Sequence, residues 1–242
     1  MLAIRCYDRF TCLGLDPWGG QQEARGDESA GPWRAANVFQ ELDAEREWYA
    51  NFSATPPTLS YFPANGTAPP TSVIVSKLAT LIRVAGGAAD SPADGIQLAG
   101  FTLTHSATTF SKPYEVPSGG DWSMHRGGAV FATFARNLSV TNVHFTRLGG
   151  NAVTLSEWVR DASFVGSEFS WIGDNGILQL GSVRFDRSGD KDPYSNDLMD
   201  GADGMHPVGT SVKGCIFREI GCVPPSTMGS PAHLSGWGQN SL

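Results

Sequence analysis

Three carboxylates stand beside apolar, strand-like segments and have the side-chain chemistry that cleavage of a glycosidic bond requires. Such hydrolysis needs two carboxyl groups about 5 to 10 Å apart, one protonated and one ionised. Glu157 ends one apolar segment, Asp174 precedes the next, and Asp203 follows in an acidic stretch. We expect these three carboxylates to converge on one groove as the catalytic candidates.

Four other residues have side chains suited to holding a sugar. Trp122 and Trp158 offer flat apolar faces for the C–H-rich side of a sugar ring. His125 and Arg126 can hold hydroxyl groups or a carboxylate. The same two residues also suit a polysaccharide lyase, which needs an anion clamp and a base near the C5 proton of a uronic acid. The residue types therefore leave hydrolase and lyase chemistry open.

An aspartate-rich stretch precedes His206 and raises the question of a metal. Its members are Asp186, Asp190, Asp192, Asp197, Asp200 and Asp203. Such density makes either a Ca²⁺ site or a solvated loop, and the spacing does not match the twelve-residue calcium loop. We expect no cofactor and no metal ligands, with Ca²⁺ as the alternative.

A repeated frame indicates the elements that must position these residues. An apolar residue, a spacer, Asn or Gly, two more residues and a large apolar residue recur at 98–103, 140–145, 164–169 and 212–217. Asn and Gly readily enter the left-handed backbone region that a corner between strands requires. The central copies lie 24 residues apart, which fits one three-strand coil of a solenoid. The other spacings, 42 and 48 residues, fit one coil plus inserts at about 107–128 and 182–208.

The frame also predicts which side chains point into the coils. The expected inward column is Leu103, Phe145, Phe169 and Phe217. The expected outward rows are Thr102, His144, Glu168 and Ile216, then His105, Arg147, Trp171 and Glu219. Asn151 and Asn175 occupy equivalent turns, where stacked amides should hydrogen-bond from coil to coil. We therefore expect an all-β fold, a parallel β-helix of about four coils preceded by a β-hairpin.

Several segments carry a resemblance to a known group of proteins. They read EWY…TLSYFP over 47–63, GIQLAGFTLTHS over 95–106, VPSGGDW over 116–122, GGAVF over 127–131 and LGGNAVTLS over 148–156. With them the chain resembles right-handed parallel β-helix proteins of the pectate-lyase-like superfold, over roughly residues 37–221. Many of those proteins are large, secreted and active on polysaccharides.

The resemblance implies an extended polysaccharide bound in a groove on the sheet of first strands, which both inserts would flank. A glycoside hydrolase is the leading interpretation and a lyase the next. A non-catalytic glycan-binding β-helix and an inactive truncated fragment are the alternatives, because the superfold hosts many functions. The Asp-Asp and Gly-His-Gly signatures of polygalacturonases and the calcium cluster of pectate lyases are not recognisable. The resemblance also implies an extracellular full-length parent, although no signal peptide is visible here.

Composition divides the chain into four segments. Residues 1–36 are expected to be irregular, 37–94 to hold the hairpin and the strands leading into the coils, 95–221 to form the β-helix, and 222–242 to be an irregular tail. Because the repeat stops without an evident cap, we expect a fragment of a longer protein, or self-association through the open solenoid end.

Bulk properties exclude two classes of partner. The net charge is −7 and no basic run is present, which argues against a nucleic-acid backbone as partner. No apolar stretch approaches the 18 residues of a membrane-spanning helix. A polysaccharide remains the expected partner.

Overall fold

The computed structural model describes residues 3–6, 33–109, 125–181, 204–221 and 225–228. The chain divides into two compact units, Met1–Val75 and Ser76–Leu242. No helix in these described ranges is long and apolar enough to cross a membrane. The architecture is nearly all β, as the sequence predicted.

The first unit contains two antiparallel strand pairs. The strands β3 (Trp48–Asn51) and β4 (Thr58–Tyr61) form the hairpin expected from the sequence. The short 3₁₀ helix η1 (Phe39–Glu41) precedes them. In the segment expected to be irregular, β1 (Ala3–Cys6) pairs with β2 (Trp33–Ala36).

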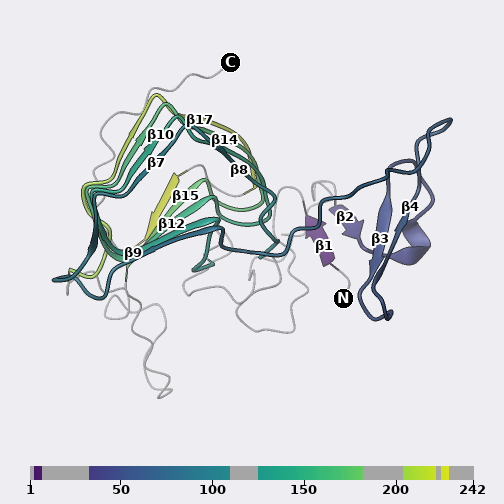
Figure 1. Ribbon diagram of the computed structural model, residues 1–242, viewed down its shortest axis with the longest axis horizontal. Coiled ribbons are helices and arrows are strands. Elements are labelled where there is room, and N and C mark those ends of the chain that lie inside the picture. Colours follow the sequence, from purple (N-terminus) through teal and green to yellow (C-terminus); the bar gives the residue numbers. More distant parts are fainter. Residues whose placement is uncertain (1–2, 7–32, 110–124, 182–203, 222–224, 229–242) are drawn as a thin grey trace, which may run out of the picture. The chain divides into compact units, whose positions relative to one another are not determined.

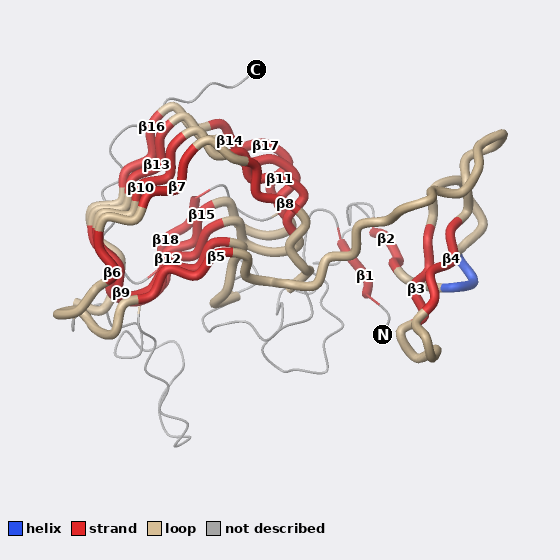
Figure 2. Tube along the Cα trace, viewed as in Figure 1, coloured by secondary structure: helices blue, strands red, loops and turns tan. Residues whose placement is uncertain are grey.

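The second unit is a parallel β-helix made of three sheets (Figures 1 and 2). The first sheet has the order β18 (Pro225–Met228), β15 (Ile177–Leu180), β12 (Val153–Arg160), β9 (Val130–Arg136) and β5 (Ile82–Ala85), and β6 (Ala93–Asp94) also pairs with β9. The second sheet contains β16 (Ser211–Lys213), β13 (Ser163–Val165), β10 (Ser139–Thr141) and β7 (Gln97–Ala99). The third sheet contains β17 (Ile216–Ile220), β14 (Glu168–Ile172), β11 (His144–Leu148) and β8 (Thr102–Thr104).

The four copies of the repeated frame stack in register, one on each coil. Val140 pairs with Leu98 and Phe164, and Phe164 pairs with Val212. The corner residue of every copy has a positive φ, from 52° at Asn142 to 73° at Gly100. The frame therefore predicted both the coil spacing and the bend between the second and third sheets.

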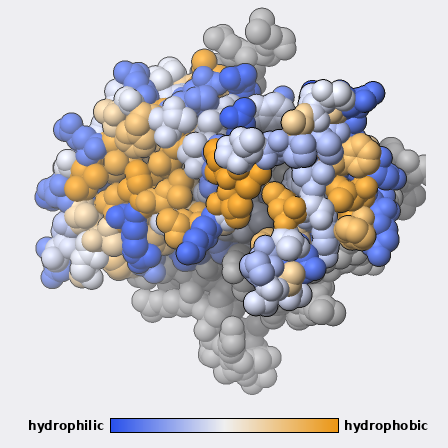
Figure 3. Space-filling view, turned by 45° about the vertical axis from the view of Figure 1, so that its right-hand side comes forward, coloured by the Kyte–Doolittle hydropathy of each residue, from blue (hydrophilic) through white to orange (hydrophobic). Residues whose placement is uncertain are grey.

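The predicted aromatic column forms the centre of the core. The rings of Phe145 and Phe169 stack with centroids 4.6 Å apart, and those of Phe169 and Phe217 with centroids 4.5 Å apart. Phe145 and Phe169 are fully buried, whereas Leu103 and Phe217, on the first and last described coils, are half-buried. Figure 3 shows a broad group of apolar side chains on the left half of the surface in this view and a second group near its right edge. Self-association through a solenoid end stays a prediction.

The β-helix is longer than the range 95–221 expected from the sequence. Strands β5 and β6 already pair with β9, so the first sheet begins before residue 95. At the other end, β18 pairs with β15 within the segment expected to be an irregular tail. Both extensions lie outside the repeated frame, because the frame marks only the corner between the second and third sheets.

Candidate functional site

An open pocket of about 270 Å³ lies on the outer face of the first sheet, and we call it the first-sheet pocket. Its described lining residues are Arg83, Ala85, Gly86, Gly87, Arg126, Phe131, Thr133, Phe134, Ser156 and Glu157. They come from β5 and the turn after it, from β9, from β12, and from the segment before β9. The pocket therefore crosses three neighbouring coils of the sheet that the sequence predicted to carry the groove.

A β-bulge directs Glu157 toward this pocket. Ser156 pairs with Thr133 but Val159 pairs with Ala135, so β12 has one more residue than β9 at this point. In a regular strand consecutive side chains face opposite sides, so Ser156 and Glu157 could not both line the pocket. Glu157 has a φ of 58°, in the left-handed region, and this backbone turn at the bulge directs its side chain outward. Phe134 in β9 has a φ of 45° and lines the pocket next to Thr133 in the same way. Bulges and strained residues of this kind concentrate next to functional sites.

The Glu157 carboxylate has a polar neighbour on the adjacent strand. Thr133 Oγ1 donates a hydrogen bond to Glu157 Oε2 at 3.3 Å. The Glu157 side chain is half-buried, and it is the one carboxylate among the described residues that line the pocket. An acid at this position is accessible to a ligand and is also oriented by the protein.

Two arginines add positive charge to the same pocket. Arg126 donates through Nη1 to Ser156 Oγ at 2.7 Å and through Nη2 to the carbonyl oxygen of Gly181 at 2.9 Å. Arg83 lies over the ring of Phe131, with its guanidinium carbon 5.2 Å from the ring centroid. The guanidinium of Arg126 is thus held in place before any ligand binds.

Asn151 fixes the backbone on both sides of Arg126. Its Nδ2 donates to the carbonyl oxygens of His125 at 2.8 Å and Gly127 at 2.7 Å. Its Oδ1 accepts from the backbone N–H of Asn175 at 3.0 Å and from Asn175 Nδ2 at 2.8 Å. The predicted amide ladder is confirmed, and it also anchors one wall of the first-sheet pocket.

Comparison with known proteins supports the fold. No protein-family model and no curated protein matches the chain. A solved structure described as a glycoside hydrolase is similar to it, with a TM-score of 0.63 and 20% sequence identity. The match covers 84% of this chain, which spans only 38% of the length of that neighbour. At this identity the likeness shows a shared β-helix-like fold, and the assignment to the pectate-lyase-like superfold stays a prediction.

The structure does not bring Asp174 to Glu157. Asp174 is only 6% exposed and accepts a hydrogen bond from Asn175 Nδ2 at 3.2 Å, in the turn before β15. Val153 pairs with Ile177, near that turn, and Glu157 lies four residues further along β12. Four residues of strand span roughly 13 Å at 3.3 Å per residue. Asp174 does not line the first-sheet pocket, and a catalytic role for it stays a prediction.

Trp158 is partly covered by an arginine. The guanidinium carbon of Arg160 lies 4.6 Å from the Trp158 ring centroid, and Arg160 donates to the carbonyl oxygens of His206 at 2.6 Å and Gly204 at 2.8 Å. Burial lowers the pKa of the Arg160 guanidinium. One face of Trp158 therefore packs against Arg160, which ties β12 to residues 204–206.

Of the other predicted site residues, His125 is among the described residues, whereas Trp122 and Asp203 are not. His125 is half-buried and its ring lies close to Gly127, where an added Cβ would approach His125 Nε2 to 2.8 Å. The aspartates at 186–200 also lie outside the described residues. Within the described ranges, no group of three His, Cys, Asp or Glu side chains could hold a metal ion.

Sequence reasoning missed Arg83, Phe131 and Phe134 as pocket residues. One signal of the bulge was available in the sequence. Strands β9 and β12 begin 23 residues apart, at Val130 and Val153, whereas the corners that follow them, at 142 and 166, are 24 residues apart. The extra residue is the bulge at Glu157. Aligning the strand starts as well as the corners would have predicted it.

Proposed function

We propose that this chain is the β-helix part of a carbohydrate-active protein that binds a glycan in the first-sheet pocket and cleaves it by hydrolysis. The observation that carries the proposal is the bulge that turns Glu157 into the pocket beside Arg126. The solved neighbour described as a glycoside hydrolase supports the same class.

The pocket has the parts that recognition of a sugar requires. Phe134 supplies aromatic surface for the C–H-rich face of a sugar ring, and Phe131 adds ring surface beside the Arg83 guanidinium that lies over it. Arg126 keeps a fixed orientation through Ser156 and Gly181, so its guanidinium is preorganised at the pocket wall. A pocket that crosses several strands suits a chain of sugars better than a single one.

In the proposed reaction Glu157 exchanges a proton with the substrate. As general acid it would protonate the oxygen of the leaving sugar, and as general base it would activate the attacking water. Both mechanisms need a second carboxyl group across the scissile bond. Asp203, which lies outside the described residues, stays the acid that the sequence predicts for this role.

Product formation on a panel of plant and algal polysaccharides tests the proposal. Wild type should release new reducing ends from at least one of them, and Glu157→Gln should lower that rate by about 10²- to 10⁴-fold, the usual contribution of a general acid or base. Asp43→Asn, at an exposed carboxylate in the first unit that does not line the pocket, is the matched control and should retain the wild-type rate. An undiminished rate in Glu157→Gln would remove Glu157 from the mechanism.

Glycan binding without catalysis is the second candidate. It is favoured by the single carboxylate among the described lining residues, since hydrolysis needs two. Under this alternative a polysaccharide is retained by the protein but yields neither reducing ends nor unsaturated products. Unsaturated products alone would instead indicate a lyase.

A further inference from the structure

The bend at the end of the third sheet carries residue types that its backbone does not favour. Each coil has three bends with a positive φ. The first bend holds Gly95, Asn137, Asp161 and Gly209, and the second holds Gly100, Asn142, Gly166 and Gly214. The third bend holds His105, Arg147, Trp171 and Glu219, with φ between 50° and 59°. Gly, Asn and Asp enter this region most readily and His is also enriched there, so the third bend uses unfavourable residues in three of the four coils, at Arg147, Trp171 and Glu219.

Trp171 is the centre of this row on the protein surface. Its side chain is 58% exposed, and Arg147 and Glu219 are exposed as well. Ser170 pairs with Thr146 on one side and with Arg218 on the other, so Trp171 lies between Arg147 and Glu219. Neighbouring strands are about 4.8 Å apart, so the three side chains form a continuous stripe.

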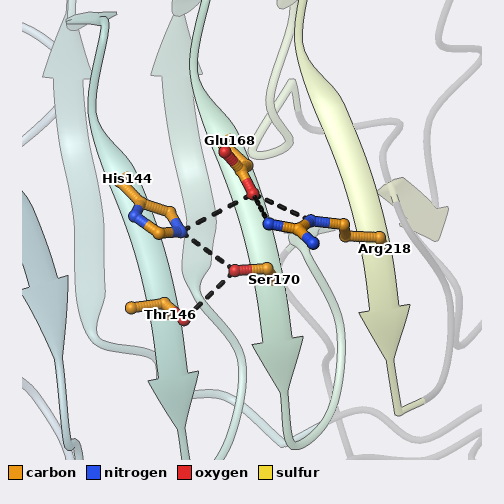
Figure 4. Close-up of polar contacts among 5 residues, drawn as sticks. All are labelled: His144, Thr146, Glu168, Ser170 and Arg218. Atoms are coloured by element: carbon orange, nitrogen blue, oxygen red, sulfur yellow. Dashed lines mark hydrogen bonds and ion pairs between the residues drawn. The ribbon is translucent and has the colours of Figure 1, made fainter.

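A connected polar network lies on the same three strands (Figure 4). Arg218 donates to Glu168 Oε1 through Nη2 and, at 2.8 Å, through Nε. His144 Nε2 lies 2.9 Å from Ser170 Oγ and 3.7 Å from Glu168 Oε1. Ser170 Oγ in turn donates to Thr146 Oγ1 at 3.1 Å. Polar groups beside Trp171 are thus held in fixed positions while Arg218 and His144 stay accessible, with side chains 59% and 39% exposed.

The chemistry of this surface indicates its occupant. An exposed indole offers an apolar face for sugar rings, and oriented Arg, Glu and His side chains exchange hydrogen bonds with hydroxyl groups. The charges are balanced, with Arg147 and Glu219 on opposite sides of Trp171 and Arg218 paired to Glu168. A balanced surface attracts no polyanion, so an uncharged glycan fits better than an acidic one. The stripe follows the stacking direction of the coils, as an extended chain requires.

We infer that the third sheet carries a second glycan-binding surface, made of His144, Arg147, Glu168, Trp171, Arg218 and Glu219, which we call the Trp171 surface. It binds an uncharged polysaccharide outside the first-sheet pocket and without chemistry. The inference rests on the proposed function for the class of ligand. It differs from that function in the face used and in needing no catalytic acid.

Affinity electrophoresis of the full chain in gels containing single uncharged or acidic polysaccharides tests the inference. The main variant is Trp171→Asn, because Asn tolerates the left-handed backbone and removes the indole. Loss of one aromatic contact should weaken retention by an uncharged polysaccharide about 2- to 12-fold, the equivalent of 0.5 to 1.5 kcal/mol. Trp48→Ala, an exposed tryptophan 51% accessible in the other unit, is the control and should be retained as wild type.

A second variant, Arg218→Gln, and a measurement of hydrolysis distinguish failure of this inference from failure of the proposed function. Arg218→Gln breaks the network but keeps Trp171, and it should weaken retention without changing the melting temperature by more than a few degrees. Glu157→Gln should lose hydrolysis but keep the part of the retention that Trp171→Asn removes. Three results would each overturn the inference. One is unchanged retention of both Trp171→Asn and Arg218→Gln, and another is no retention of wild type by any uncharged polysaccharide. The third is retention that depends on Trp171 but occurs only with acidic polysaccharides. Retention that depends on Trp171 without any hydrolysis would support it and contradict the proposed hydrolase instead.

Discussion

Replacing Asn151 with alanine should destabilise the β-helix strongly and loosen the wall of the first-sheet pocket. The Asn151 side chain is fully buried and makes four hydrogen bonds, two to the carbonyl oxygens of His125 and Gly127 and two from Asn175. Alanine can make none of them. The perturbation therefore acts on two coils and on the segment that carries Arg126.

The magnitude follows from the number of bonds. A hydrogen bond contributes about 1 kcal/mol net, so the loss of four gives a decrease in the free energy of unfolding of about 4 kcal/mol. For a domain of this size 1 kcal/mol corresponds to about 2 to 4 °C in melting temperature. Asn151→Ala should therefore melt about 8 to 16 °C below wild type.

Thermal unfolding followed by circular dichroism measures this difference. The matched control is Asn142→Gly, at an exposed corner with a φ of 52°, where the side chain can be removed and glycine suits the backbone. Its melting temperature should stay within about 4 °C of wild type, the equivalent of 1 kcal/mol. Equal shifts in the two variants would refute the ladder as a source of stability. A large shift in Asn142→Gly alone would refute the reasoning about corners.

Two further predictions concern the core and the first bend. Phe169 stacks between Phe145 and Phe217, so Phe169→Ala should lower the free energy of unfolding in urea by about 3 to 5 kcal/mol. Phe217 is only half-buried, so Phe217→Ala should lower it by less. Equal losses in the two variants would contradict the stacking. The hydrogen bond from Arg136, at 2.5 Å, and a second from Asn137 lower the pKa of Asp94 below its ordinary value of 3.8. Because a depressed carboxyl pKa stabilises the fold above the unfolded-state value, this contribution is complete above about pH 4 and is lost as the pH falls through the lowered pKa. Arg136→Gln should raise the pKa of Asp94 in an NMR titration, and an unchanged pKa would show that the pair is not formed in solution.

The repeating parts of the fold could be predicted because each coil repeats the same residue spacing and the same contacts with its neighbours. The spacing of 24 residues between Asn142 and Gly166 fixes the coil length, and from it follow the Phe145–Phe169 stack and the Asn151–Asn175 ladder. A solenoid repeats its contacts between neighbours, so a correct register for one pair of coils extends to the next.

The non-repeating parts could not be predicted in the same way. Strands β5 and β18 pair at the two ends of the first sheet without a copy of the frame, so no internal alignment marks them. The pocket depends on the bulge at Glu157, which changes the length of one strand by a single residue. Arg83 lines the same pocket as Glu157 although it lies 74 positions before Glu157 in the chain. Only the stacking of the coils brings these two residues together.

A crystal structure of Glu157→Gln with an oligosaccharide from the polysaccharide it binds tests the central claim most directly. We predict a sugar ring in the first-sheet pocket, within hydrogen-bond distance of the Arg126 guanidinium and of the side chain at position 157. An oligosaccharide bound only elsewhere, with the first-sheet pocket filled by solvent, would contradict the account.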